Sequence, residues 1–279
     1  MNNTPAILAE IVEEKKLEVL EAKRKVSLSL LRDRLIDIAP PRDFAFALSP
    51  EVGRVKVIAE IKRKSPSAGW IRPEYEDDSF RPGPVAARYH ESGASAISCL
   101  TDEKFFGGKL PFLAAVKAAT SLPVLRKDFL IDPYQVYEAR VAGADAILLI
   151  AECLDDDLMR EMLDVASELS LSVLIEVHDE ENLRRVAPLV TPGSHRLLGV
   201  NNRDLRTMKV DLEHSFAMHK LAPFPDLFVS ESGIRTKNDM NRLRDAGVRT
   251  VLVGEHLMRE KDPGEALRLL LGADLADSR

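Results

Sequence analysis

Polar and charged side chains end four short apolar segments of the sequence. They are Glu60 with Lys62, Lys127, Glu176, and Asn201 with Arg203. Amines and carboxylates that converge on one place shift one another's pKa values, which is what general acid–base catalysis requires. A salt-bridged rim that only solvates the ends of the segments is the alternative, but the recurrence in four segments favours a catalytic site.

Alternation along the segments predicts which of these side chains point the same way. In the first segment Glu60 and Lys62 share a face, and the opposite face is apolar, as expected where a strand meets helices. Lys127 lies on the opposite face of its segment from Arg126 and Asp128. This segment is too short to show which of its two faces points inward.

Two glycines end the last two apolar segments, at a position typical of a phosphate site. Gly233 follows Ser232, and Gly254 precedes Glu255, where we expect a short extra helix to begin. Glycine lets the backbone approach phosphate oxygens closely, and barrel enzymes frequently bind phosphate here through main-chain N–H groups. Tight turns without a ligand are the alternative, but two glycines at these two segments favour phosphate.

The elements that must position these residues follow from the apolar pattern. Eight segments of about four to eight residues, rich in Val, Ile and Leu, are typical of buried parallel strands. They are 55–62, 96–101, 124–128, 146–151, 173–177, 197–201, 227–231 and 250–254. Amphipathic helix patterns alternate with them, at 84–92, 110–119, 133–142, 156–169, 180–189, 212–221, 237–246 and 264–271.

Eight strand–helix units predict an α/β fold, a (β/α)8 TIM barrel, whose active site lies at the carboxyl ends of the strands. A doubly wound open sheet is the alternative, but no GxGxxG motif follows the first strand. Residues 5–37 have a helical pattern in which Lys15 interrupts an apolar stripe, and two prolines at 40 and 41 end it. We therefore expect a single barrel domain over residues 1–279, with residues 1–45 as an N-terminal helical extension.

The composition excludes several classes of protein. The 279 residues contain 39 Lys and Arg against 45 Asp and Glu, a formal charge of −6, which does not suit a general nucleic-acid or anionic-membrane binder. Cys99 and Cys153 lie in separate apolar surroundings, so neither a disulfide framework nor a structural metal site is expected. The longest apolar runs are too short to span a membrane and no signal-peptide core is present, so we expect a soluble, cytoplasmic protein.

Six longer motifs make a family resemblance specific. They are EIKRKSPS (60–67), LTDEKFFGG (100–108), LRKDF (125–129), IEVHD (175–179), GVNNRDL (199–205) and SESGI (230–234). The sequence thus resembles the indole-3-glycerol-phosphate synthase family, carbon–carbon lyases of tryptophan biosynthesis, from residue 7 to about residue 258.

The resemblance implies a reaction and its participants. The substrate is 1-(2-carboxyphenylamino)-1-deoxyribulose 5-phosphate, the products are indole-3-glycerol phosphate, carbon dioxide and water, and no metal or organic cofactor takes part. The resemblance assigns Lys127 as the general acid, and it makes Lys62, Glu60 and Glu176 the acid–base candidates for the dehydration. It also implies that Asn201 holds the reacting groups by hydrogen bonds.

The resemblance further implies binding residues. Phosphate-binding positions are matched by the side chains of Ser65, Arg203 and Ser232 and by the main-chain amides of Gly233, Gly254 and Glu255. Phe105 and Phe129 match residues that pack around the substrate ring. The extension would cover the barrel mouth, with residues 40–46 beside the substrate, and a monomer that can associate with other enzymes of tryptophan biosynthesis is expected.

Two alternatives belong to other functional classes. Another phosphate-sugar barrel enzyme, such as phosphoribosylanthranilate isomerase, needs fewer acid–base groups than Lys62, Lys127 and Glu176 provide. A non-catalytic barrel would not explain the charged strand ends. Trp70, after the first strand, is equally consistent with a cover over an aromatic substrate and with loop packing.

Overall fold

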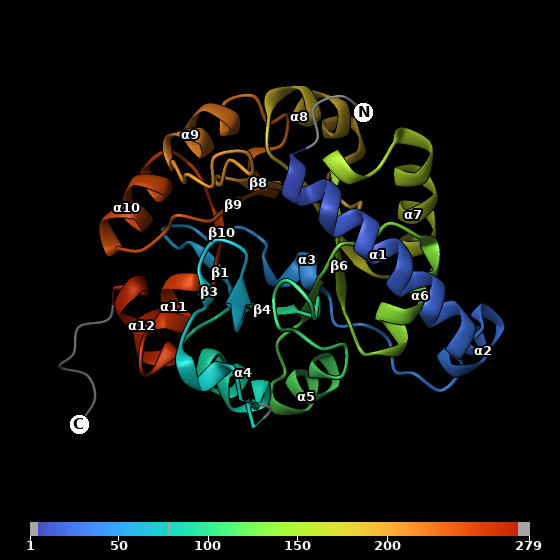
Figure 1. The fold of residues 1–279 in the computed structure, drawn as a ribbon. Helices are drawn as coiled ribbons and strands as arrows, with labels where there is room; N and C mark the ends of the chain where they lie inside the picture. The colour runs from blue at the N-terminus through green and yellow to red at the C-terminus, as the bar shows by residue number, and fades with distance from the viewer. Residues whose placement is uncertain (1–4, 78, 273–279) are drawn as a thin grey trace.

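Eight parallel strands close into a barrel in the computed structural model, which describes residues 5–77 and 79–272 (Figure 1). Each strand pairs with the next along the chain, and the last pairs with the first. They are β1 (Lys56–Ile61), β4 (Ala96–Leu100), β5 (Val124–Lys127), β6 (Ala146–Ile150), β7 (Ser172–Val177), β8 (Arg196–Asn201), β9 (Phe228–Glu231) and β10 (Thr250–Val253). The predicted (β/α)8 TIM barrel is confirmed, while the predicted domain ends, 1–4 and 273–279, lie outside the described residues.

Helices surround the barrel and separate consecutive strands (Figure 1). They are α4 (Pro82–Glu91), α5 (Phe112–Ala119), α6 (Pro133–Val141), α7 (Asp156–Glu168), α8 (Glu180–Val186), α9 (Glu213–His219), α10 (Lys237–Asp245), α11 (Glu255–Arg259) and α12 (Pro263–Leu271). Shorter elements are the hairpin of β2 (Lys64–Ser65) and β3 (Gly69–Trp70) and the 3-10 helices η1 (Pro73–Tyr75), η2 (Ala151–Cys153), η3 (Ala187–Leu189) and η4 (Pro225–Leu227). The short helix expected to begin at Glu255 is present as α11.

The strand side chains form an outer and an inner core, as expected for strands that are buried on both faces. Val57 and Ala59 of β1 pack in the outer core between the barrel and the helices. Ile58 packs in the inner core with Leu125 and Leu174. The predicted orientation of the first strand is therefore confirmed, and its alternation continues along the same face toward the mouth of the barrel.

The N-terminal extension begins with two helices. α1 (Ala6–Lys25) ends where Val26 adopts an extended conformation, and α2 (Leu28–Leu35) follows Ser27, whose side chain accepts a backbone N–H of α2. The prediction of one helix over residues 5–37 is wrong because serine is a better helix cap than an interior helix residue. α1 lies across the face of the barrel at which the strands end (Figure 1).

A later part of the extension closes the opposite end of the barrel. In α3 (Phe44–Ala47), Phe44 is fully buried against the inner core. The backbone N–H of Arg42 donates to the carboxylate of Asp145 at 2.6 Å, directly before β6 begins. The prediction that residues 40–46 neighbour the substrate is therefore wrong, because this segment lies where the strands start.

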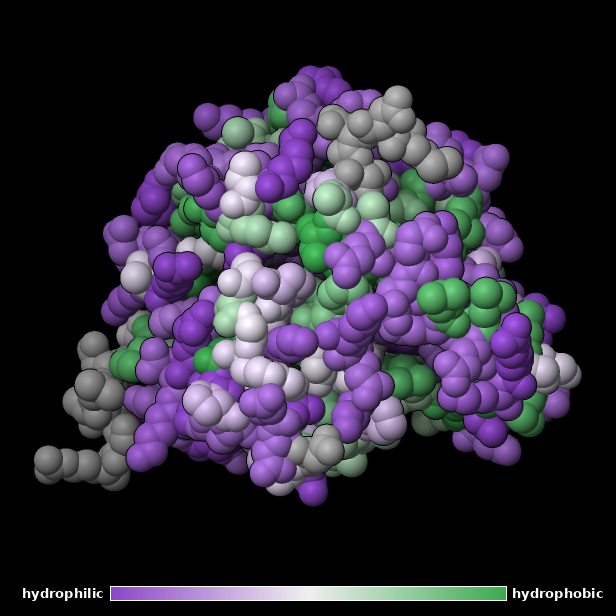
Figure 2. Space-filling model, in the orientation of Figure 1, coloured by the Kyte–Doolittle hydropathy of each residue, from purple (hydrophilic) through white to green (hydrophobic). Residues whose placement is uncertain are grey.

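The face of the molecule that carries the extension is mainly hydrophilic, with hydrophobic atoms gathered over α1 and α2 (Figure 2). Leu17, Leu20 and Ile36 of the extension are exposed. Among the described residues, no helix combines the length and the apolar character that a membrane crossing needs.

Candidate active site

A cavity of about 450 Å³ opens at the carboxyl ends of the strands. α1 forms part of its wall through Ile7, Leu8 and Ile11. With the exception of Phe105, all predicted site residues line this cavity: Glu60, Lys62, Ser65, Lys127, Phe129, Glu176, Asn201, Arg203, Ser232, Gly233, Gly254 and Glu255.

Lys127 lies at the centre of a buried charge cluster. Its Nζ is 2.5 Å from Glu176 Oε2 and 3.2 Å from Glu231 Oε2. The orientation that the sequence left open is thereby resolved: Lys127 points into the barrel, while Arg126 and Asp128 pair with each other on the other face. Burial alone would lower the pKa of Lys127, but the carboxylates raise it well above its ordinary value, so the side chain is an ammonium.

Glu176 is the ionised partner of this ammonium. Burial favours the neutral carboxyl, but Lys127 and His178 outweigh burial and lower the pKa of Glu176 to about 2. Asn201 donates its side-chain N–H to Glu176 Oε1 at 3.1 Å, and its own oxygen accepts the backbone N–H of Arg203 at 3.0 Å. The end of β8 therefore fixes the carboxylate on the end of β7.

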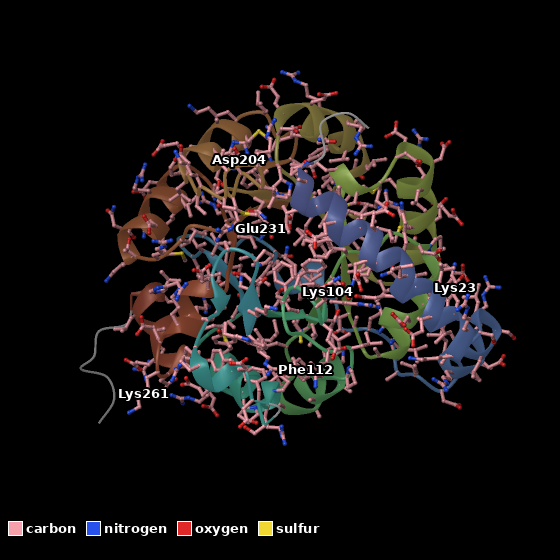
Figure 3. The ribbon with its side chains drawn as sticks, viewed as in Figure 1. Lys23, Lys104, Phe112, Asp204, Glu231 and Lys261 are labelled. Carbon is pink, nitrogen blue, oxygen red and sulfur yellow. The ribbon has the colours of Figure 1, made fainter. Side chains whose placement is uncertain are left out.

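Glu231 is a site residue that the sequence analysis missed. It ends β9 near the middle of the barrel (Figure 3), where burial and the neighbouring Glu176 raise its pKa to about 8 although Lys127 opposes them. This shift favours the protonated form of the carboxyl group at neutral pH. Gly199 on the adjacent strand is the sequence feature that could have indicated this side chain. A Cβ at this position would lie 2.2 Å from Glu231 Oε1, so only glycine leaves room for the carboxyl group.

His178 is a second residue without a predicted role in the site. Its Nδ1 is 3.3 Å from Glu152 Oε2 and its Nε2 is 3.4 Å from Glu176 Oε1. Burial would lower the pKa of this imidazole, but the two carboxylates raise it above its ordinary value. The ring thus lies between two carboxylates that favour its charged form.

Lys62 forms a second pair with Glu60 of β1, with Nζ 2.7 Å from Oε1. The adjacent end of β10 makes room for this pair, because a Cβ at Gly254 would lie 2.3 Å from Glu60 Oε1. Gly254 therefore has a steric role that the predicted phosphate function did not require. The two lysine–glutamate pairs line one cavity from different strands.

The residues predicted to bind phosphate gather beyond β8, β9 and β10. Arg203 Nη2 is 3.3 Å from Glu255 Oε2, and the other oxygen of Glu255 accepts from Arg259 at 2.7 Å. Ser232 and Gly233 follow β9 with positive φ values of 70° and 85°, which make a tight turn at the cavity wall. Two arginines beside a single carboxylate leave this end of the cavity suited to an anion.

The loop after β1 contributes Ser65 to the wall, where its Oγ accepts the backbone N–H of Ala68 at 3.2 Å. Trp70 packs within the loops instead. The guanidinium of Arg63 lies 5.1 Å from its ring centroid, and the ring leaves no room for a side chain at Gly107. Of the two alternatives for Trp70, loop packing describes its position.

The apolar wall of the cavity contains Phe129 and Phe106, whose ring centroids are 5.9 Å apart. The predicted Phe105 does not line the cavity, because its ring packs against the Lys104 ammonium, 5.4 Å from the centroid. Asp102 accepts the backbone N–H groups of both phenylalanines. This turn, rather than strand alternation, decides which ring faces the cavity.

The closed barrel and the lysine–glutamate pairs at its mouth define a class of protein, the TIM-barrel enzymes that perform acid–base chemistry on small anionic molecules. Comparison with known proteins gives the particular family. The family model for indole-3-glycerol phosphate synthase matches residues 8–270, and the chain belongs to this family.

Curated relatives agree with the family model. The chain is 44% identical to the indole-3-glycerol phosphate synthase of a Polaromonas species over 270 residues, which are 96% of this chain and 99% of the relative. It is 45% identical to that of Rhodospirillum rubrum over 268 residues (95% and 99%) and 48% identical to that of Rhodopirellula baltica over 237 residues (85% and 88%). The predicted family is confirmed, and with it the class of enzyme, a decarboxylating lyase of tryptophan biosynthesis.

Solved structures share the fold at low sequence identity. A 3-hexulose-6-phosphate synthase has a TM-score of 0.61 and 19% identity, and the match covers 78% of this chain and 99% of that one. KGPDC from Streptococcus mutans has a TM-score of 0.55 and 11% identity, with 78% and 95% covered. At these identities the likeness shows the barrel fold alone.

Proposed function

We propose that the chain closes the indole ring of 1-(2-carboxyphenylamino)-1-deoxyribulose 5-phosphate and releases indole-3-glycerol phosphate, carbon dioxide and water. The observation that carries this proposal is the buried trio of Lys127, Glu176 and Glu231. One ammonium lies between two carboxyl groups whose pKa values are shifted in opposite directions. Such a trio offers both a proton donor and a proton acceptor at neutral pH.

In the first half of the reaction, the ring carbon that bears the carboxylate attacks the ketone of the sugar chain. The ketone oxygen gains electrons as the bond forms, and the ammonium of Lys127 donates a proton to it. Glu176 holds this ammonium by an ion pair at 2.5 Å, and the carboxyl group of Glu231 lies 3.2 Å from it, which orients it within the cavity. Loss of carbon dioxide then restores the aromatic ring.

In the second half, the hydroxyl group leaves as water and the five-membered ring loses a proton. This step needs an acid at the leaving oxygen and a base for the proton. Lys62, Glu60 and Glu176 are the candidate groups besides Lys127, and they line the same cavity. Asn201 supports the step by holding Glu176 in position.

The substrate is bound at two ends. We assign its phosphate to the side chains of Ser65, Arg203 and Ser232 and the main-chain amides of Gly233, Gly254 and Glu255. Its aromatic ring packs on Phe129 and Phe106, with Phe106 taking the role that the sequence assigned to Phe105. Holding both ends brings the ring carbon against the ketone, which supplies a large part of the rate gain.

The chain acts as one barrel domain over residues 1–279, and α1 of the extension covers the mouth. It works as a monomer in the cytoplasm without a metal or organic cofactor, and it can associate with other enzymes of tryptophan biosynthesis.

An indole fluorescence assay tests the proposal. The purified protein is mixed with the carboxyphenylamino-deoxyribulose phosphate in buffer that contains EDTA, and indole emission is followed over time. We expect emission to rise with the wild-type protein and to be lost with Lys127→Ala, because that variant lacks the proposed acid.

Lys16→Ala is the matched control, because Lys16 is an exposed lysine that pairs only with Glu13 of its own helix among the ion pairs of the described residues. Its activity is expected to equal that of the wild type. A folded wild-type protein that produces no emission would favour an isomerase or a non-catalytic barrel, and inorganic phosphate binding would then separate these two alternatives.

A further inference from the structure

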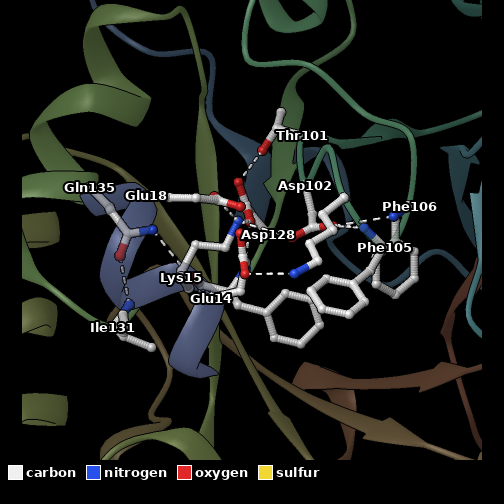
Figure 4. A network of polar contacts seen from close by, with 12 residues as sticks. Glu14, Lys15, Glu18, Thr101, Asp102, Phe105, Phe106, Asp128, Ile131 and Gln135 are labelled. Atoms are coloured by element: carbon white, nitrogen blue, oxygen red, sulfur yellow. Dashed lines mark hydrogen bonds and ion pairs between the residues drawn. The ribbon is translucent and has the colours of Figure 1, made fainter. Parts of the chain in front are cut away.

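A buried lysine connects the extension to the ring-binding end of the cavity. Lys15 of α1 has only 3% of its side chain exposed, and its Nζ lies 3.0 Å from Asp102 and 2.9 Å from Asp128 (Figure 4). Glu18, one turn later on α1, is 2.7 Å from the same nitrogen. A single ammonium thus joins α1, the loop after β4 and the end of β5.

Each aspartate has a second set of contacts that reach the cavity. Asp102 accepts the backbone N–H groups of Phe105 and Phe106, at 2.8 and 3.2 Å. Asp128 accepts the backbone N–H of Phe129 at 2.8 Å, and it directly follows the catalytic candidate Lys127. Lys15 therefore holds the two carboxylates that fix both aromatic rings of the cavity wall.

The charges in this cluster depend on one another. The burial of Lys15 opposes its charge, but Asp128 and Asp102 raise its pKa well above the ordinary value. Lys15 and Arg126 in turn hold the pKa of Asp128 well below its usual range. Lys15 and Asp128 therefore stabilise each other's charged form, and the loss of the ammonium removes a main counter-charge from the buried carboxylate.

The spacing along α1 places Lys15 on the same face of the helix as two residues of the cavity wall. Leu8 and Ile11 lie seven and four residues before Lys15, on the same stripe of α1, and both line the cavity. The position of Lys15 therefore sets how α1 presents these two side chains. The lysine that interrupts the apolar stripe in the sequence completes the buried face in the structure.

We propose that Lys15 is a positioning residue that locks α1 onto the ring-binding end of the site, so that cover helix and aromatic wall are held as one unit. This inference rests on the proposed placement of the substrate ring against Phe106 and Phe129. It makes this part of the phosphate-binding end independent of Lys15, because Arg203 and Ser232 follow β8 and β9, which lie across the barrel from β4 and β5.

Lys15→Met keeps the length of the side chain and removes its charge, so it tests the inference directly. We expect kcat/KM for the full substrate to fall at least about tenfold, while inhibition by inorganic phosphate changes less than about twofold. Backbone hydrogen exchange at Phe105 and Phe106 is expected to accelerate. Lys15→Arg, which keeps the charge, should recover part of the lost kcat/KM.

Lys16→Met is the matched control and should behave as the wild type in all three measurements, because its side chain is exposed. An unchanged kcat/KM in Lys15→Met overturns the inference. Equal losses of substrate turnover and phosphate inhibition also overturn it, since they indicate general damage to the fold. If the wild-type protein itself is inactive, the proposed function fails instead, and the two results are distinguishable.

Asp102→Asn keeps the inference testable if Lys15→Met does not fold. The variant retains an oxygen that accepts the loop N–H groups, and Lys15 keeps Asp128 and Glu18 as partners. We expect a raised KM and faster exchange at Phe106 with unchanged phosphate inhibition. Wild-type values of KM and exchange in this variant would show that the ion pair does not position the loop.

Discussion

At the scale of single residues, the centre of the site is an ammonium shared between two carboxyl groups of unequal proton affinity. Lys127, His178 and a hydrogen bond from Asn201 stabilise the ionised form of Glu176. Glu231 is also buried, and burial together with the charge of Glu176 raises its pKa, which favours its protonated form. Since the two groups interact, the ionised form of Glu176 contributes to the raised pKa of Glu231.

Glu176→Gln removes a negative charge and a base without changing the size of the side chain. We expect turnover to fall at least about tenfold while the fold is kept, because the carboxylate both orients Lys127 and accepts a proton. Steady-state kinetics and circular dichroism check the two parts. Glu180→Gln, an exposed position on α8, is the control, and near-wild-type turnover in Glu176→Gln would remove this carboxylate from the mechanism.

The sequence predicted the paired lysines and glutamates because charged side chains are rarely buried in strands unless they are paired or take part in a site. It did not predict Glu231, although this residue also ends a strand, because its inward direction depends on the room left by Gly199 of β8. It selected Phe105 instead of Phe106 because loops have no fixed alternation. In both cases the deciding contact comes from a residue far away or from a turn.

At the scale of the elements, the extension shows what local patterns cannot determine. The apolar stripe of α1 is visible in the sequence. The burial of Lys15 within this stripe depends on Asp102 and Asp128, which lie far away in the chain, so no local spacing predicts it. The position of α3 follows from topology, because the chain must return to the start of β1 before the barrel begins. This return places Phe44 at the end of the barrel where the strands start.

Phe44→Ala tests whether α3 closes the end of the barrel at which the strands start. We expect the free energy of unfolding to fall by about 3–5 kcal/mol, because a fully buried aromatic side chain is removed from the inner core. KM is expected to stay within about twofold, because the substrate binds at the other end. Urea unfolding and steady-state kinetics measure these effects.

Phe46→Ala is the matched control on the same helix, since Phe46 is 75% exposed. Its free energy of unfolding should stay within about 0.5 kcal/mol of the wild-type value. Equal destabilisation by the two substitutions would mean that α3 does not close the barrel through Phe44.

At the scale of the whole molecule, the two ends of the barrel have different roles. The end where strands start is filled by the apolar inner core and α3, and it supports stability. The end where strands stop carries buried charged and polar groups, including Glu60, Glu176 and Glu231, and it supports function. The sequence predicted the functional end from the eightfold strand–helix repeat, since a barrel places all strand ends of one kind on one face. It did not predict that α3 fills the other end, because it placed residues 40–46 beside the substrate.

The buried charged groups at the functional end should therefore make the free energy of unfolding depend on pH. Glu231 allows this dependence to be measured, because its pKa changes on folding. Its pKa rises from an ordinary value of 4.5 to about 8 on folding. Below pH 4.5 both the folded and the unfolded chain hold the proton. Between these values the unfolded chain releases the proton while the folded chain keeps it, so the stability contributed by the group is lost as pH rises.

Glu231→Gln removes this titration and keeps a neutral side chain of the same shape. We expect the variant to gain stability relative to the wild type between pH 5 and pH 8.5, by on the order of 2–4 kcal/mol, because only the wild type must bury a group that prefers to ionise in water. Urea unfolding of both proteins at the two pH values gives this difference, and groups that titrate equally in both proteins cancel. A stability difference that is independent of pH would show that Glu231 is ionised in the folded protein and that Lys127 is shared by two carboxylates.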